Sequence, residues 1–270
     1  MRLYNKVSVA NKRYRKDVNY MLPDAIFLNI HMYGVMIAVG IVFAFIVLFS
    51  YSKKKNIDEK LVNFIFYDGI GAIVFGFLSA AFFQGLYDYI ENPDAGFHIG
   101  DSITFMGGLF GGVVFFLTVY FILRKKLNLH LSDIISIIPC SILIGHGFGR
   151  IGCFFAGCCY GRETDSILGI KFPNLPNPVL PTQLYEAAFL FIMFGVCSYL
   201  VMKKDFKHNL SLYLISYGIF RFLLEFIRGD DRGQFIAGIT PSQFWSIVMI
   251  VAGILVFFIL KGKTNKAALK

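Results

Sequence analysis

Long apolar segments, separated by short polar ones, occupy most positions along this 270-residue chain. A helix that crosses the hydrocarbon layer of a membrane needs roughly 20 mostly apolar residues. Such stretches lie at about 26–50, 61–85, 103–123, 133–151, 182–202, 210–228 and 241–260. They are longer and more continuous than the alternating segments of about 10 residues that build outer-membrane barrels. We therefore expect an all-α integral membrane protein with seven transmembrane helices.

The composition excludes most other protein classes. Hydrophobic residues make up 56% of the sequence and charged residues only 16%, whereas a soluble domain carries about a quarter charged residues. Disordered, coiled-coil and collagen-like proteins are excluded by the same values. The polar segments are therefore expected to be loops between membrane helices.

The distribution of lysine and arginine predicts the orientation. Basic residues follow the first, third, fifth and last predicted helices, at 53–60, 124–126, 203–207 and 261–270. The segment 86–102, on the opposite side, has four acidic residues and neither lysine nor arginine. Short basic loops stay in the cytoplasm. We therefore expect the N-terminus outside and the C-terminus in the cytoplasm.

Three segments follow from this topology. Residues 1–24 carry six basic residues and lack the apolar core of a signal peptide, so we expect a surface segment that contacts anionic headgroups. Residues 25–262 form the seven-helix domain, and residues 263–270 form a cytoplasmic tail. Much of the net charge of +9 then lies at membrane surfaces, which argues against a nucleic-acid-binding protein.

Ionisable side chains stand inside the predicted helices, where each costs about 2.5–3.5 kcal/mol and usually marks a function. Glu186 lies in the fifth helix, and one face of the sixth presents Tyr217, Arg221, Glu225 and Arg228 at spacings of four, four and three. One interpretation of Glu225 is an internal Arg–Glu pair that joins helices. The other is that an arginine near the outer leaflet holds a phosphate, which its planar guanidinium suits.

A glycine-rich segment at 145–161 ends the fourth predicted helix, with His146 and Arg150 on one helical face. Its glycines permit close packing and then an irregular turn, which a membrane tolerates only beside a protein-lined cavity. A cavity lined by these side chains and by backbone amides would suit an anionic headgroup. Gly107 and Gly108 open the third helix, and such a run is by itself typical of helix packing.

Together these segments resemble the prolipoprotein diacylglyceryl transferase family over roughly residues 25–260. The motifs that carry the resemblance are His31-Met32-Tyr33-Gly34, Gly107-Gly108-Leu109, Gly149-Arg150-Ile151-Gly152, Pro181-Thr182-Gln183-Leu184-Tyr185-Glu186, Tyr217-Gly218, Phe220-Arg221, Glu225-Phe226, Arg228 and Gln243. The resemblance implies a multi-pass enzyme of the bacterial cytoplasmic membrane. It would transfer the diacylglyceryl group of phosphatidylglycerol to the lipobox cysteine thiol in the signal peptide of a preprolipoprotein, and release glycerol phosphate.

Site residues are carried over position by position. The resemblance implies that Arg150 and Arg221 handle the phosphate, because fixed arginines in a dry cavity stabilise the charge of a leaving group. The other residues that it assigns to the polar cavity and to the lipid are Tyr33, Tyr217, Glu225, Arg228, Gly107 and Gly108. The expected partners are phosphatidylglycerol, the signal peptide and the surrounding membrane lipids, and no cofactor is expected.

The chain departs from the family pattern at four positions. The pattern has His, Asn, an acidic residue or Gln, and Arg where this chain has Met106, Cys153, Cys158 and Leu78. The histidine replaced at Met106 is the leading candidate for the base that takes the thiol proton. His146, one turn from Arg150, is a replacement candidate, as are His98 and Glu225. A packed helix residue is the other interpretation of His146.

Cys153, Cys158 and Cys159 cluster on the outer side after the fourth helix. We expect no metal site, because the chain has no Cys-x-x-Cys pair and only scattered histidines. A disulfide from Cys153 to Cys158 or Cys159 is expected on an oxidising face, and a thiol that forms a covalent lipid intermediate is the alternative. Cys140 and Cys197 lie in apolar runs and are expected to be buried.

Other function classes stay open at this point. A paralogous transferase would use the same lipid donor with another acceptor. A lipid or small-anion transporter fits the arginine and glutamate content, although the sequence lacks the matching interrupted helices of an inverted-repeat transporter. A membrane thiol–disulfide protein would need cysteines at redox-active spacing, which the sequence does not contain.

Overall fold

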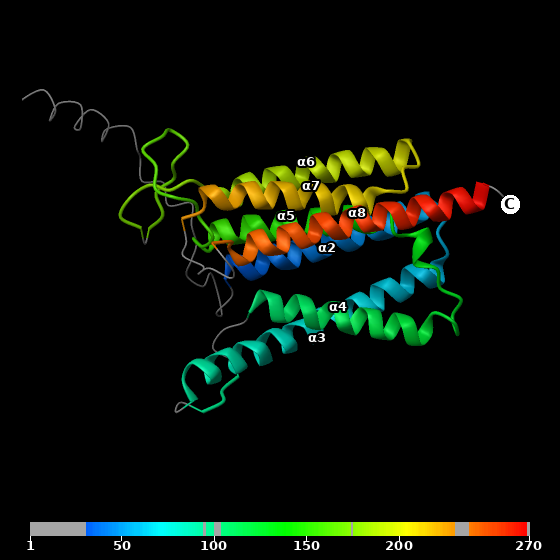
Figure 1. Ribbon diagram of the computed structural model, residues 1–270, viewed down its shortest axis with the longest axis horizontal. Helices are drawn as coiled ribbons and strands as arrows, with labels where there is room; N and C mark the ends of the chain where they lie inside the picture. Colours follow the sequence, from blue (N-terminus) through cyan, green and yellow to red (C-terminus); the bar gives the residue numbers. More distant parts are fainter. Residues whose placement is uncertain (1–30, 94–95, 100–103, 174, 230–237, 269–270) are drawn as a thin grey trace, which may run out of the picture. The chain divides into compact units, whose positions relative to one another are not determined.

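The computed structural model describes residues 31–93, 96–99, 104–173, 175–229 and 238–268 (Figure 1). The predicted basic surface segment, residues 1–24, lies outside the described residues. Within them, the α-helices are α2 (Met32–Lys54), α3 (Glu59–Glu91), α4 (Phe105–Leu123), α5 (Ile138–Phe155), α6 (Thr182–Lys203), α7 (Asn209–Leu224) and α8 (Pro241–Ala268). Two short 3₁₀ helices, η2 (Leu131–Asp133) and η3 (Glu225–Ile227), complete the helical elements.

The helices confirm the predicted class of all-α membrane protein. In the described part of the chain, six helices are long and apolar enough to span a membrane, and these are α2, α3, α5, α6, α7 with η3, and α8. The apolar stretch Gly107–Leu123 of α4 is shorter than that criterion requires. Extended backbone among the described residues pairs only in isolated bridges. The seventh span and the orientation of the termini stay predictions.

Several helix boundaries differ from those predicted from hydropathy, and local signals explain two of them. The fourth predicted helix, 133–151, begins only at Ile138, because Pro139 occupies its first turn, where a missing N–H is tolerated. The second begins at Glu59, where the Asp58 carboxylate accepts a hydrogen bond from the Lys60 N–H at 2.9 Å and caps the helix. Hydropathy does not detect either of these local signals. Helical backbone in α8 also continues to Ala268, through most of the predicted tail.

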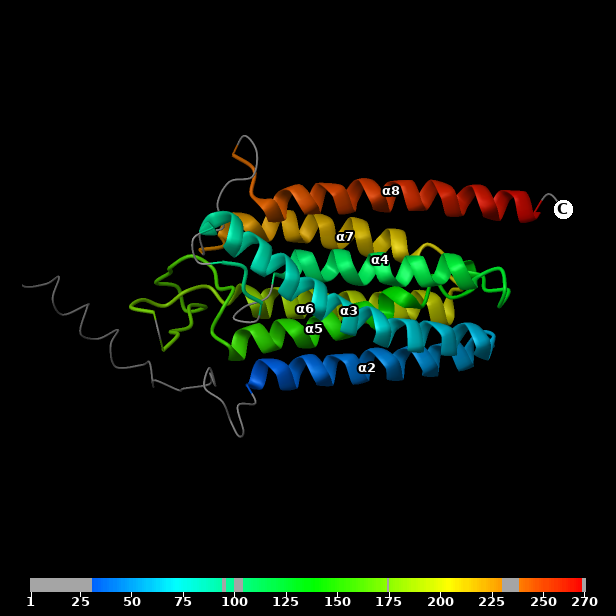
Figure 2. The ribbon, with the colours of Figure 1, turned by 90° about the horizontal axis from the view of Figure 1, so that it is seen from below.

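The chain divides into two compact units. The first contains the described residues up to Val47 and from Ser136 onward, and the second contains Leu48–Ile135. In the first unit, α5 packs on α6 and α7 packs on α8, and α7 also contacts α5 and α6. Figure 1 and Figure 2 show α5, α6, α7 and α8 side by side as a bundle. In the second unit, α3 packs along α4.

Small residues allow α7 and α8 to approach closely. A Cβ atom added to Gly218 of α7 would lie 2.7 Å from Ile250 Cγ1 and 2.9 Å from the Ser246 carbonyl oxygen of α8. One added to Gly253 of α8 would lie 2.7 Å from Ile215 Cγ1 of α7. Close backbone contact of this kind drives helix association where lipid removes the hydrophobic effect between helices.

A buried asparagine at the start of α7 connects three segments of the first unit by hydrogen bonds. Asn209, at the start of α7, is fully buried and donates hydrogen bonds from Nδ2 to the carbonyl oxygens of Ser136 (3.0 Å) and Cys197 (2.9 Å). These bonds connect the start of α7 to the segment before α5 and to α6. In a low-dielectric interior such bonds fix the relative position of the three segments.

The loop between α5 and α6 carries a small core of its own. Phe172 and Val179 pack against Phe154 of α5, and partly buried apolar side chains surround them. The backbone N–H of Arg162 donates to the Ile227 carbonyl oxygen at 2.9 Å, so the loop is bonded to η3, which follows α7. Figure 1 and Figure 2 show this loop at the end of the bundle where α5 and α7 finish and α6 and α8 begin.

We expect the substitution Gly218→Ala to destabilise the bundle by about 1–3 kcal/mol, because the added methyl group must displace backbone of α8. The midpoint of thermal unfolding in detergent should fall. The matched control is Gly195→Ala in α6, since a Cβ at Gly195 meets no atom within 4 Å. Equal midpoints for the two variants would contradict the close α7–α8 contact.

Candidate functional site

A buried carboxylate joins three helices at the end of the first unit where α5 finishes and α6 begins. Glu186 of α6 is fully buried, and its Oε1 accepts a hydrogen bond from the Tyr217 hydroxyl of α7 at 2.6 Å. The same oxygen lies 3.1 Å from Arg150 Nε and 3.8 Å from His146 Nε2 of α5. The cluster therefore brings together Arg150, His146 and Tyr217, which the sequence assigned to the site, around a residue that it did not assign.

Two neighbouring side chains contact Arg150 at its Nε atom. This atom donates to His146 Nε2 at 3.3 Å and pairs with Glu186. Among the described residues, the terminal nitrogens of Arg150 make no hydrogen bond or ion pair, and the side chain is 18% exposed. The guanidinium is thus fixed at one nitrogen, and its other two nitrogens are available to a ligand within the described part of the chain.

The position of His146 bears on both interpretations of this residue. Its ring lies edge-on to the Tyr217 ring, with 5.2 Å between centroids. Its Nε2 accepts the Arg150 bond, so this lone pair is engaged. The packed interpretation and a role in orienting Arg150 both fit this geometry, and the base role stays a prediction.

A second cluster surrounds Arg221 at the end of α7. Arg221 Nη1 lies 2.7 Å from Glu225 Oε2, and Nη2 donates a hydrogen bond to Ser242 Oγ of α8 at 2.8 Å. The other carboxylate oxygen of Glu225 accepts from Thr240 Oγ1 at 3.0 Å. The geometry matches the internal Arg–Glu pair that the spacing of four suggested. Sequence reasoning missed Ser242 and Thr240, because serine and threonine are common residues whose role becomes visible only when their hydrogen-bond partners are known.

The two clusters lie close enough to act on each other. Arg221 exerts an electrostatic effect on both Glu186 and His146, as Arg150 does. Two guanidinium groups from α5 and α7 therefore act on one buried carboxylate of α6. In a medium of low dielectric constant each charge needs such a counter-charge.

Tyr33 stands at the first turn of α2, against the same end of α5. A Cβ atom at Gly152 would lie 3.2 Å from Tyr33 Cδ2, so the tyrosine ring packs where α5 has no side chain. Tyr33 is 41% exposed and lies within electrostatic range of Arg150. The predicted site residue is therefore beside the cluster, at a position that a ligand can reach.

The predicted lipid-contacting glycines belong to the second unit. Gly107 and Gly108 face α3, where a Cβ at Gly107 would lie 2.7 Å from Phe83 Cβ and one at Gly108 would lie 3.2 Å from Ala80 Cβ. Ser79 Oγ also donates to the Gly107 carbonyl oxygen at 2.8 Å. These contacts are the helix packing that the glycine-rich sequence at the start of α4 suggested. Contact of Gly107 and Gly108 with lipid stays a prediction.

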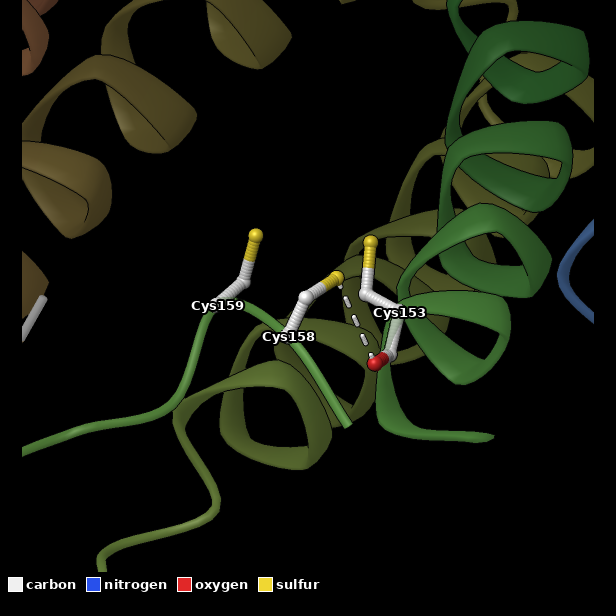
Figure 3. A group of neighbouring side chains, drawn as sticks. All are labelled: Cys153, Cys158 and Cys159. Atoms are coloured by element: carbon white, nitrogen blue, oxygen red, sulfur yellow. Dashed lines mark hydrogen bonds between the residues drawn. The ribbon is translucent and has the colours of Figure 1, made fainter. Parts of the chain in front are cut away.

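A tight turn after α5 brings three cysteines together. The sulfur atoms of Cys153, Cys158 and Cys159 all lie within 4.8 Å of one another, and Figure 3 shows the Cys158 sulfur directed toward Cys153. All five cysteines of the chain are thiols in the structure, so the expected disulfide is not formed here and stays a prediction. Cys140 and Cys197 are fully buried, as expected. We expected no metal because the chain has no Cys-x-x-Cys pair and only scattered histidines, whereas this turn brings three cysteine sulfur atoms together at another spacing.

Residues of the Pro-Thr-Gln motif hold this turn. Gln183 Nε2 donates to the Cys158 carbonyl oxygen, and Thr182 Oγ1 donates to the Cys159 carbonyl oxygen at 2.8 Å. Both side chains are buried at the start of α6. The motif therefore positions the cysteine turn, a role that the sequence did not reveal.

The environment of the turn favours a thiolate at one position. Hydrogen bonds with the Cys153 and Cys158 thiols lower the pKa of Cys159, and the charge of Arg228 and a hydrogen bond from it act in the same direction. Hydrogen bonds with the other two thiols raise the pKa of Cys158. Arg228 is thus placed beside Cys159, and the negative charge of the cluster is expected to reside on that sulfur.

An apolar helical bundle with a buried Arg–Glu–His–Tyr cluster at one end defines a membrane protein with a polar site. Residues 22–259 match the family model described as prolipoprotein diacylglyceryl transferase. The chain belongs to this family, as the resemblance predicted, and is therefore a membrane transferase of lipoprotein biosynthesis.

Individual relatives agree over almost the whole chain. A phosphatidylglycerol–prolipoprotein diacylglyceryl transferase of Clostridium tetani is 36% identical over 239 residues, which cover 85% of this chain and 93% of the relative. Transferase 2 of Clostridium perfringens is 32% identical, covering 91% and 97%. The enzyme of Teredinibacter turnerae is 31% identical, covering 91% and 85%.

We expect Cys159 to react with iodoacetamide at a pH where an ordinary thiol, with a pKa of about 8.5, is mostly protonated. Its lowered pKa keeps the thiolate populated as the pH falls toward 7. Fragment-resolved mass spectrometry of metal-free protein would measure labelling at each cysteine across pH. Arg228→Gln should shift the Cys159 profile to higher pH. Identical profiles for Cys158 and Cys159 would contradict the assignment.

Proposed function

We propose that this protein transfers the diacylglyceryl group of phosphatidylglycerol to the lipobox cysteine thiol of a preprolipoprotein and releases glycerol phosphate. The relatives that cover most of the chain are named for this donor and for prolipoprotein. The observation that carries the proposal is Arg150, which is fixed through Nε while its two terminal nitrogens have no hydrogen-bond or ion-pair partner among the described residues. A guanidinium presented in this way suits bidentate binding of a phosphate.

The two arginines have different parts in this reaction. Arg150 binds the phosphate oxygens directly. Arg221 is engaged by Glu225 and Ser242, so it contributes positive potential from behind the site. Both are held in place before the lipid arrives, and charge that develops on the leaving phosphate meets dipoles and cations already oriented toward it. Tyr33, Tyr217 and Arg228 complete the polar lining in this proposal.

We also infer a topology in which α4 crosses the membrane as a seventh span. Lys53 and Lys54 end α2, Lys203 ends α6 and Arg124 follows α4. The polar site lies where α5 and α7 end and α6 and α8 begin, at the opposite end of α6 from Lys203. With short basic segments in the cytoplasm, the site faces the outer side of the bacterial cytoplasmic membrane.

The proposed domain limits follow from this topology. Residues 1–24 form the outer surface segment, 25–262 the catalytic domain and 263–270 the cytoplasmic tail. The acceptor is a cysteine in the signal peptide of a preprolipoprotein that has been translocated to the outer side. This placement therefore gives the acceptor thiol and the lipid headgroup access to the same end of the bundle.

Replacement of Arg150 tests the proposal directly. Arg150→Lys should lower kcat/KM by about 10²–10³-fold, because a point charge cannot reproduce the fixed two-nitrogen contact. The assay uses purified protein in detergent with phosphatidylglycerol and a lipobox peptide, and measures glycerol phosphate release and the gel shift of the peptide. Arg124→Lys, at an exposed position after α4, is the matched control.

The same assay separates the remaining functions. Glycerol phosphate release without lipidation of the peptide would indicate another acceptor. Movement of intact lipid without cleavage would indicate a transporter, and full activity of Arg150→Lys would contradict direct binding of the phosphate by this side chain.

His146 is proposed to position Arg150, because its Nε2 already accepts the Arg150 N–H. His146→Gln keeps an acceptor at this place and should retain most activity, whereas His146→Leu should lose it mainly through a higher KM. Loss of activity in both variants, with an altered pH profile of kcat, would instead indicate the base role. Circular dichroism would confirm that both variants are folded.

A further inference from the structure

The three thiols of the turn after α5 have the spacing of metal ligands. Their sulfur atoms lie within 4.8 Å of one another, and three thiolates around a tetrahedral Zn²⁺, at Zn–S distances of about 2.3 Å, lie about 3.8 Å apart. Small side-chain rotations close this difference. A disulfide requires a sulfur separation of about 2.05 Å and would use only two of the three thiols.

Backbone and side-chain hydrogen bonds hold the cluster, and one of them runs from the Cys158 thiol to the Cys153 carbonyl oxygen at 3.6 Å (Figure 3). The Cys158 N–H donates to the Cys153 carbonyl oxygen at 3.2 Å. The side chains of Gln183 and Thr182 donate to the carbonyl oxygens of Cys158 and Cys159, respectively. Cys159 adopts a left-handed backbone with φ of 65°. A non-glycine residue in this region stores strain that persists only when its surroundings impose it. The turn is therefore built to direct three thiols to one place.

The electrostatic surroundings suit thiolates. Arg228 lies beside the Cys159 sulfur, and Arg150 is within electrostatic range of Cys153 and Cys159. Thiolates are the ligand form of cysteine, and three of them around Zn²⁺ leave one net negative charge. Two neighbouring guanidinium groups offset that charge.

The site is open on one side. Among the described residues, this group offers three ligand atoms. Cys158 is exposed and Cys159 is half-buried, so a fourth ligand can approach from outside. Catalytic zinc sites have three protein ligands and one open position, whereas structural sites are closed by four.

We propose that Cys153, Cys158 and Cys159 bind one Zn²⁺ ion whose fourth position takes the thiol of the acceptor cysteine, an inference that rests on the proposed function. Coordination deprotonates a thiol and maintains it as the thiolate, the nucleophilic form. Cys153 lies three residues after Arg150, on the same face of α5. The bound thiolate and the bound phosphate would therefore be held by adjacent turns.

The chemical step balances without any redox partner. The acceptor S–H releases its proton to solvent on binding the metal. The zinc-bound sulfur forms a C–S bond to the glycerol methylene carbon while the C–O bond to the phosphate ester breaks. The electron pair of that bond leaves with glycerol phosphate, which Arg150 holds. Zn²⁺ suits the step because it undergoes no oxidation or reduction.

Metal binding is tested first, without lipid or peptide. Reduced full-length protein in detergent is titrated with Zn²⁺, and elemental analysis after desalting should find about one zinc per chain. The variants Cys153→Ser, Cys158→Ser and Cys159→Ser should each lose the tightly bound ion. Cys140→Ala is the matched control, since this thiol is buried in α5 away from the cluster. Because Cys158 is exposed, Cys158→Ser tests binding with the least effect on folding.

The fourth position is tested with Co²⁺ in place of Zn²⁺. Three thiolates should give sulfur-to-cobalt charge-transfer absorption, and its intensity should rise when a lipobox peptide adds a fourth thiolate. The same peptide with Ser in place of its Cys should cause no change. An unchanged spectrum with the Cys peptide would overturn the thiol step.

Failure of this inference and failure of the proposed function give different results. Transfer activity that persists in a strong chelator and in Cys158→Ser overturns the zinc site and leaves the transferase function intact. A disulfide between these cysteines in protein alkylated directly in cells, or tight binding of Cu⁺ with exclusion of Zn²⁺, also overturns it. Stable zinc binding without any transfer from phosphatidylglycerol contradicts the proposed function, and the thiol step with it.

Discussion

The site depends on the neutralisation of two arginines by carboxylates buried in the same apolar bundle. Glu186 Oε1 accepts from Tyr217 and pairs with Arg150, so a single oxygen connects α5, α6 and α7. Removing one partner of a buried pair leaves an uncompensated charge and typically costs about 3–5 kcal/mol. The Glu186 carboxylate therefore sets both the packing of the three helices and the direction of the Arg150 guanidinium.

The same residues explain why the polar site lies at a helix end and not in the middle of the bundle. α5 finishes just beyond Arg150, and the first turn of α6 supplies Thr182 and Gln183, whose side chains hold the carbonyl oxygens of the cysteine turn. Irregular backbone at membrane depth is stable only where protein groups satisfy it. The motif around Glu186 thus performs two tasks from one helical segment: it holds the turn and supplies the counter-charge.

Hydropathy was sufficient to predict most of the helices, because lipid imposes a minimum apolar length on each span. It misplaced the start of α5, where Pro139 and not apolarity determines the boundary. Spacing of four was sufficient to predict the Arg221–Glu225 pair, since both residues lie on one helix. It was insufficient for Glu186 and Ser242, because their partners come from other helices and only tertiary packing brings them together. The sequence signals for Glu186 were its place in an apolar helix and its place in the Pro181–Glu186 motif, and neither identified its partners.

The transfer of an alkyl group to sulfur makes two electrostatic demands that conflict at one location. A leaving phosphate needs positive charge, and the nucleophile must carry negative charge close to it. Arg150 and the three thiols meet these demands from the last turns of α5 and the loop that follows, with Arg228 beside Cys159. A metal ion held by the thiols would stabilise an incoming thiolate at the position nearest the arginine-bound phosphate.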